Sequence, residues 1–301
     1  MAIAEVPLAA ARRIHTYHGE ADLFEMELKT PFEEKVRPQA KLELYGKGEE
    51  SHYQFKHAGP FQLEGIASYR SGYTQVAGNR SLKHEGRYST LTTSVIEGLN
   101  ILDVLTADRV VAQISTAHPL DGAVPEVSFT GTRFENLRIA GHKIELDTNL
   151  DILGPRPVED QSYFDNQSVL DRMAQQYENL GAADYFPDWA CERYPRDQEK
   201  WRTTDEMTNA DFAHCSLVNR VHCDQKSFGH VIEVPHFGKF FLGELRVKRA
   251  PAKNPKENYD AYTFHLAMVR MELGCSVSAS GSASTADSNG QGSQGSGSGK
   301  G

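Results

Sequence analysis

Hydrophobic and polar residues alternate along much of the first half of the chain, as in strands that have one buried face. In residues 23–28, Phe24, Met26 and Leu28 fall on one face and the glutamates between them fall on the other. Short runs of this kind recur as far as Leu146, separated by glycine-containing turns such as Ser71-Gly72. This spacing predicts a mainly β fold, an antiparallel β-sandwich or a barrel-like domain.

One segment has helical rather than strand periodicity. The run "SVLDRMAQQYENLG", residues 168–181, predicts a helix with Ser168 as N-cap and Gly181 just past its end. Its apolar stripe consists of Val169, Met173, Tyr177 and Leu180. The helix belongs to a helical and irregular insertion, residues 155–213, within the β domain.

The irregular part of this insertion is rich in aromatic residues. Trp189, Tyr194 and Trp201 lie close together in the sequence among prolines and charges. These rings are candidates for binding a sugar or another ring-shaped ligand, with the insertion acting as a lid or an interaction surface. The alternative is that they anchor the insertion onto its own domain.

Strand-like runs resume after His214 and continue to Leu273. From Ser276 onward the chain is composed almost entirely of glycine, serine, alanine and small polar residues. Such a composition offers little apolar area to bury, so we expect residues 276–301 to be a disordered tail. The remainder, residues 1–275, is expected to form a single β-rich domain.

Charge and cysteine content narrow the classes of partner and compartment. The chain is acidic, with a formal net charge of −9 and a pI near 5.7, which argues against nucleic acid as a partner. No apolar run is long enough for a membrane span, and the order of residues near the N-terminus predicts no signal peptide, so we expect a cytoplasmic protein. Four cysteines indicate a reducing compartment, although Cys215 and Cys223 are close enough to pair across a hairpin in an oxidising one. The disulfide state of Cys191 and Cys275 stays open.

A group of histidines and cysteines near the end of the β region is the best candidate for metal chemistry. The candidate ligands are His214, Cys215, His222, Cys223, His230 and His236. Imidazole and thiolate groups bind zinc and other transition metals, but this spacing matches no standard motif. The alternative is buried cysteines and hydrogen-bonded strand histidines, so no cofactor is predicted and a metal ion stays an alternative.

A second titratable group lies near the N-terminus, in the sequence "HTYHGEAD". His15 and His18 are candidates for a general acid or base together with Glu20 and Asp22. The competing interpretation is a solvated first strand of the sheet.

The segment from Thr92 to Leu146 resembles bacterial surface domains of the choice-of-anchor P type. In that family a "V-x-x-x-N-L-L-x-x-x-x-T-A-D-x-V" run precedes a "F-x-x-L-x-V-x-G" run. The residues that carry the resemblance are Val95, Leu99, Asn100, Ile101, Leu102, Thr106, Ala107, Asp108, Val110, Phe134, Leu137, Ile139 and Gly141. The resemblance implies an all-β, non-enzymatic module and a location at the cell surface.

These observations favour a non-catalytic β module that binds a ligand or assembles with itself. Its contact surface would be an exposed sheet edge or the aromatic insertion, and its partner a second copy, a small ligand or a carbohydrate. The alternative is an enzyme, with or without a bound metal ion, whose site lies near His214 to His236 and is covered by the insertion at residues 155–213.

Overall fold

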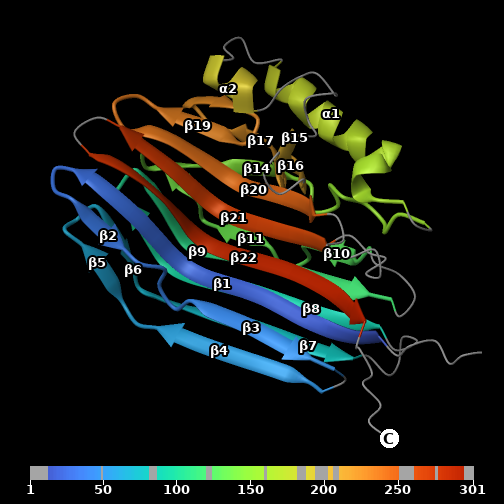
Figure 1. The fold of residues 1–301 in the computed structure, drawn as a ribbon. Coiled ribbons are helices and arrows are strands. Elements are labelled where there is room, and N and C mark those ends of the chain that lie inside the picture. Colours follow the sequence, from blue (N-terminus) through green and yellow to red (C-terminus); the bar gives the residue numbers. More distant parts are fainter. Residues whose placement is uncertain are drawn as a thin grey trace, which may run out of the picture.

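The computed structural model describes residues 13–48, 50–80, 87–119, 124–158, 161–181, 188–193, 203–205, 210–250, 261–274 and 277–294. Two ten-stranded sheets are stacked in this structure, and the helices lie along one side of them (Figure 1). Neighbouring strands pair antiparallel in the ladders of both sheets. The predicted mainly β, sandwich-like fold with one helical insertion is confirmed.

The first sheet, sheet A, has the order β15-β16-β20-β21-β22-β1-β2, with β3 paired to β1, and β19 bridging β18 and β20. Its strands are β1 (Arg13–Thr30), β2 (Glu34–Val36), β3 (Leu42–Lys47), β15 (Thr203–Asp205), β16 (Ala210–Ser216), β18 (Lys226–Phe228), β19 (Val231–Val234), β20 (Gly238–Ala250), β21 (Ala261–Gly274) and β22 (Ser278–Gln294).

The second sheet, sheet B, has the order β13-β12-β9-β8-β6-β5; β7 joins β8 to β4, and β10 and β11 pair with β9. Its strands are β4 (His52–Ala58), β5 (Phe61–Leu63), β6 (Ala67–Tyr69), β7 (Ser71–Arg80), β8 (Tyr88–Ile101), β9 (Leu105–His118), β10 (Glu126–Ser128), β11 (Arg133–Glu135), β12 (Arg138–Ile139) and β13 (His142–Lys143). A separate two-stranded sheet joins β14 (Glu145–Thr148) to β17 (Val218–His222).

The two sheets approach each other closely because small side chains line part of their interface. A Cβ atom on Gly19 of β1 would lie 2.6 Å from Thr92 Oγ1 and Val76 Cγ1 of sheet B. On β22, the Ser284 hydroxyl donates to the carbonyl of Ser94 at 3.0 Å and accepts from the backbone N–H of Ala112 at 3.1 Å. Small and hydroxyl-bearing residues therefore join the sheets by hydrogen bonds as well as by apolar contact.

The position of β22 corrects the predicted boundary of the C-terminal tail. Ser278–Gln294 lies inside sheet A and pairs with β21 on one side and with β1 on the other. Ala279, Ala283 and Ala286 on this strand are buried. The strand contributes backbone hydrogen bonds on two sides and allows close packing, although it buries little apolar area of its own. The domain therefore extends past residue 275, and residues 295–301 lie outside the described part.

A row of irregular positions crosses the middle of sheet A and shifts the alternation of its side chains. The regular ladders skip Leu23, Ser284, Met268 and Gly243 on four neighbouring strands. Of these, Ser284 and Gly243 have positive φ angles, 55° and 63°. Before the row, β1 buries the odd positions Tyr17 and Ala21, and after it the even positions Phe24 and Met26. The row acts like a line of β-bulges, each of which changes the face that the following residues present.

The predicted helix is α1 (Gln167–Gly181), and all four residues of its apolar stripe are buried. Its N-terminus differs from the prediction, because Asn166 Oδ1 accepts hydrogen bonds from the backbone N–H groups of Ser168 and Val169 at 3.0 and 3.3 Å. Asn166 therefore caps the helix in place of Ser168. A single turn, η1 (Tyr163–Asp165), precedes it and α2 (Asp188–Arg193) follows it.

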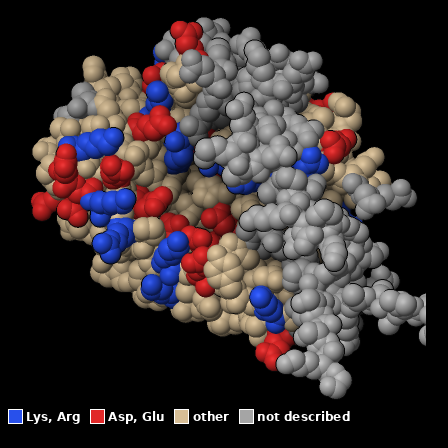
Figure 2. Space-filling model, in the orientation of Figure 1, with Lys and Arg blue, Asp and Glu red and all other residues tan. Residues whose placement is uncertain are grey.

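The outer face of sheet A, away from sheet B, faces the viewer in Figure 1, with α1 and α2 beside β16 and β20. Lys and Arg side chains are interspersed with Asp and Glu on this face, which is hollowed near its centre (Figure 2). None of the described helices is long and apolar enough to cross a membrane.

Candidate functional site

The six predicted metal ligands are distributed over several elements. Cys215 is buried in the hydrophobic core, and burial raises the pKa of its thiol to about 12. His222 is exposed on β17, and the Cys223 thiol contacts the carbonyl of Gln225 at 3.5 Å. His236 is exposed in the turn between β19 and β20, with a φ of 65°.

The fold does not bring the side chains of these six residues together. Among the residues that the structure describes, ligand atoms of three His, Cys, Asp or Glu side chains come within 4.8 Å of one another only at His18, Glu20 and Glu43. Cys215 and Cys223 are free thiols and do not form a disulfide across a hairpin. The Cys191 side chain and Cys275 lie outside the described part.

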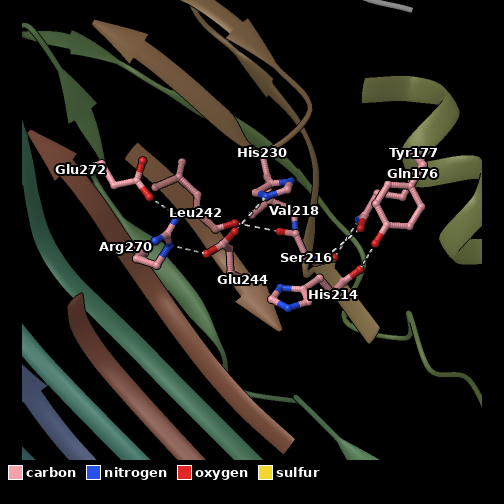
Figure 3. Close-up of polar contacts among 10 residues, drawn as sticks. All are labelled: Gln176, Tyr177, His214, Ser216, Val218, His230, Leu242, Glu244, Arg270 and Glu272. Atoms are coloured by element: carbon pink, nitrogen blue, oxygen red, sulfur yellow. Dashed lines mark hydrogen bonds and ion pairs between the residues drawn. The ribbon is translucent and has the colours of Figure 1, made fainter. Parts of the chain in front are cut away.

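His214 belongs to a network that joins α1 to sheet A (Figure 3). The hydroxyl of Tyr177 donates to the carbonyl of His214. The Gln176 amide bonds Ser216 twice, donating to its carbonyl and accepting from its N–H, each at 2.8 Å. The Ser216 hydroxyl donates to the carbonyl of Leu242 at 2.7 Å. Buried polar groups of the helix and the strand thus satisfy one another, which is a structural role.

His230 lies beside a network of charged side chains, Glu244, Arg270 and Glu272 (Figure 3). Its Nε2 lies 3.7 Å from Glu244 Oε1, and Arg270 Nε contacts the other oxygen of Glu244 at 2.7 Å. Arg270 also reaches Glu272 Oε1 at 2.8 Å. Because Glu244 is buried, its contacts with two basic side chains compensate for its loss of hydration. These contacts connect the turn after β18 to β20 and β21.

The aromatic insertion is described only in part, because Tyr194 and Trp201 lie outside the described residues. Trp189 is half-buried in α2, with its ring centroid 5.5 Å from that of Phe228 and 5.8 Å from that of Phe241. Lys239 Nζ lies 3.9 Å from the centroid of the Trp189 ring. Trp189 therefore packs on sheet A of its own domain.

A groove of about 530 Å³ lies at the end of β19, β20 and β21. Its walls include the charged or aromatic side chains of Lys226, Glu233, His236, Phe237, Lys239 and Glu272. Lys226 and Glu233 form an ion pair with each other at 3.7 Å. The groove carries both signs of charge, so its walls do not select a ligand of one charge.

The second titratable group predicted from the sequence is divided between the two faces of β1. His15 points between the sheets and stacks on Tyr88, with ring centroids 4.5 Å apart. Burial lowers the pKa of His15 to about 4 and that of the neighbouring His118 to about 3. Strand alternation places His18, Glu20 and Asp22 on the outer face of sheet A.

On that outer face, Asp22 is one of several titratable residues. Thr285 donates a hydrogen bond of 2.5 Å to Asp22 Oδ2, and burial raises the pKa of Asp22 to about 6. The other oxygen, Oδ1, is buried and accepts no hydrogen bond from the described residues. Nearby, His265 Nδ1 lies 2.5 Å from Asp287 Oδ1. Burial acts to lower the pKa of His265, but the hydrogen bond and charge of Asp287 raise it overall.

Sequence reasoning missed Thr285, His265 and Asp287 as members of this group. Thr285 and Asp287 lie in the segment predicted as a tail, and the ladder places Asp287 opposite both Glu20 and His265. No local motif joins residues that far apart in the chain. Only the pairing of β22 with β1 and β21 could have identified the group.

Exposed aromatic side chains mark a different surface, on sheet B. Tyr53 and Phe55 of β4 are 63% and 51% exposed, and Phe55 stacks on Tyr73 of β7 with ring centroids 5.5 Å apart. Among the described strands, β4 pairs only with β7. Its other side is therefore an open sheet edge, which Figure 1 shows along the lower border of the molecule.

Comparison with known proteins adds a family assignment. No curated protein matches the chain, and no solved structure matches it. Residues 15–248 match a family described as "Domain of unknown function (DUF8256)", and this segment runs from β1 into β20. Because the match covers more than half of the sequence, the chain belongs to the DUF8256 family of domains of unknown function.

Proposed function

We propose that this protein is a non-catalytic β module that associates with a second copy of itself through the open edge of β4. The observation that carries the proposal is the combination of an edge strand with exposed aromatic side chains. An open edge offers a row of backbone N–H and C=O groups to another strand. Exposed Tyr53 and Phe55 add apolar contact area at the same place.

The sequence of β4 is compatible with antiparallel pairing to its own copy. A two-fold axis through Phe55 places the two Phe55 side chains opposite each other. The same register places Tyr53 opposite His57 and Gln54 opposite Lys56, so that no two lysines face each other. Aromatic cross-strand pairs stabilise a sheet by about 0.2–1 kcal/mol each.

The size of the contact sets its expected strength. β4 has seven residues, and a pairing of that length buries less than a standard protein interface. We therefore expect a weak, reversible dimer whose population rises with protein concentration. Sheet B, to which β4 belongs, would become continuous across the two copies.

Sedimentation velocity over a concentration series tests the proposal. Wild-type protein should show a concentration-dependent shift from monomer to dimer, and Phe55→Lys should abolish it by placing two positive charges opposite each other. Phe32→Lys is the matched control, since Phe32 is also exposed, at 38%, but lies outside β4. A wild-type protein that stays monomeric, or a Phe55→Lys variant that still dimerises, contradicts the proposal. Circular dichroism checks that each variant is folded.

A further inference from the structure

We propose that His18, Glu20 and Glu43 form a binding site for a divalent transition-metal ion, with zinc as the best-matched ion. Their possible ligand atoms, one imidazole nitrogen and two carboxylate oxygens, lie within 4.8 Å of one another. This site lies on the outer face of sheet A, far along the chain from the six metal ligands that the sequence predicts between His214 and His236.

The sheet itself fixes the arrangement of the three residues. His18 and Glu20 are two positions apart on β1, so they share a face. The ladder between β1 and β3 places Glu43 directly opposite Glu20, and Tyr45 directly opposite His18. The three side chains are thus held by two hydrogen-bonded strands and not by a loop, which favours a defined geometry.

Tyr45 positions two of the three side chains. Its ring stacks on His18, with centroids 4.3 Å apart and planes 20° apart. Its hydroxyl donates to Glu43 Oε1 at 2.7 Å. Neighbouring groups that orient the ligands are a regular part of metal sites, and their loss commonly weakens metal affinity.

The local charge balance also favours a cation. Two glutamates directly opposite each other on adjacent strands repel, and Asp22 lies two positions further along the same face. Lys41 provides a positive charge here, with its Nζ 2.5 Å from Glu20 Oε1. The Lys41 side chain is 43% exposed, so it is free to turn toward solvent when a metal ion binds. Asp22 is not one of the three ligands. Its buried Oδ1 accepts no hydrogen bond from the described residues, so this carboxylate adds a further acceptor atom without a partner to the same face.

The donor set selects the class of ion. An imidazole nitrogen with two carboxylate oxygens suits zinc, whereas calcium and magnesium prefer sites made of oxygen atoms alone. Three protein ligands leave a fourth tetrahedral position for water. The partly exposed Glu43 side gives the ion access from solvent.

Isothermal titration of the full chain with zinc chloride tests the proposal. We expect one ion per chain, with binding weakened at least tenfold by His18→Ala and by Glu43→Gln. Glu27→Gln is the control, because it removes an exposed carboxylate from the same strand outside the cluster, and it should leave the affinity unchanged. Lys41→Met should tighten binding several-fold, because it removes the competing cation.

Two further measurements test the role of the Tyr45 hydroxyl and the selectivity of the site for zinc. Tyr45→Phe retains the ring but removes the hydroxyl, and it should weaken zinc binding several-fold while the thermal midpoint without metal stays unchanged. Magnesium chloride should bind far more weakly than zinc chloride. The proposal is overturned if zinc fails to bind, if the His18→Ala and Glu43→Gln variants bind it as tightly as the wild type, or if Glu27→Gln weakens binding equally.

Discussion

At the scale of single residues, burial sets the protonation of two histidines between the sheets. His15 is 4% exposed and His118 is 3% exposed, and their ring centroids lie 5.0 Å apart. A charged imidazole loses its hydration there, so burial lowers the pKa of both from the ordinary value of 6.5. Both rings are neutral in the folded protein at neutral pH.

This burial predicts that acid destabilises the protein. Below pH 6.5 the unfolded chain binds protons at His15 and His118, but the folded chain does not until about pH 4 and about pH 3. Their contribution to the free energy of unfolding is therefore complete above pH 6.5 and falls as pH decreases. Between about pH 7.5 and about pH 5.5 the contribution of each of these histidines should fall by roughly 1 kcal/mol. The raised pKa values of Asp22 and His265 act in the opposite direction and offset part of this loss, and urea titrations at the two pH values measure the net change.

The variant His118→Phe isolates the effect of one histidine. It removes one of the two protonation events in the unfolded chain and leaves the other titrating groups in place, so its loss of stability on acidification should be smaller by roughly 1 kcal/mol. An equal loss in variant and wild type would show that His118 does not titrate as its burial implies.

The sequence predicts which side chains lie side by side only where those residues are close together in the chain. The alternation of "HTYHGEAD" is sufficient to separate His15 from His18, Glu20 and Asp22, because each strand residue faces opposite to the next. It could not reveal that Glu43, Asp287 or Thr285 lies beside them. Those neighbours depend on the register of β3 and β22 against β1.

At the scale of elements, α1 shows what local pattern can specify. The apolar stripe was identified from spacing alone, and its four members are buried. The helix begins before the predicted N-cap, Ser168. Asn166 and Ser168 are both good N-cap residues, and the choice between them depends on the preceding turn. The bulge row of sheet A could not be found in this way, since skipped positions are defined only by comparing neighbouring strands.

The packing of α1 gives a prediction with an internal control. Met173 is 3% exposed, so Met173→Asp forces a carboxylate into an apolar contact and should lower the free energy of unfolding by about 3 kcal/mol. Gln175 is exposed on the opposite side, and Gln175→Asp should change the stability by less than about 0.5 kcal/mol. Chemical denaturation measures both. Comparable losses would mean that α1 packs through a different face.

At the scale of the whole molecule, the largest difference between sequence expectation and structure is the C-terminal strand. Composition rules weigh the apolar area that a segment can bury on its own. β22 is placed by what surrounds it: larger side chains on its neighbours and a sheet B that approaches closely. On Gly281, a Cβ atom would lie 2.4 Å from the carbonyl oxygen of Glu25, so a larger residue would not fit. The small residues that suggested disorder are the ones that the central position requires.

The position of β22 leads to the final prediction, which concerns truncation. A chain that ends at Gly274 loses the strand between β21 and β1, and with it the ladders that connect the two halves of sheet A. It should lose cooperative unfolding and aggregate, because two new sheet edges become exposed in the middle of the sandwich. A chain that ends at Gln294 keeps β22 complete and should retain the wild-type thermal midpoint. Thermal denaturation followed by circular dichroism, together with solubility, distinguishes the two. If the shorter chain melts cooperatively at the wild-type midpoint, β22 is not required for the fold, and the domain boundary that the sequence predicts at residue 275 holds.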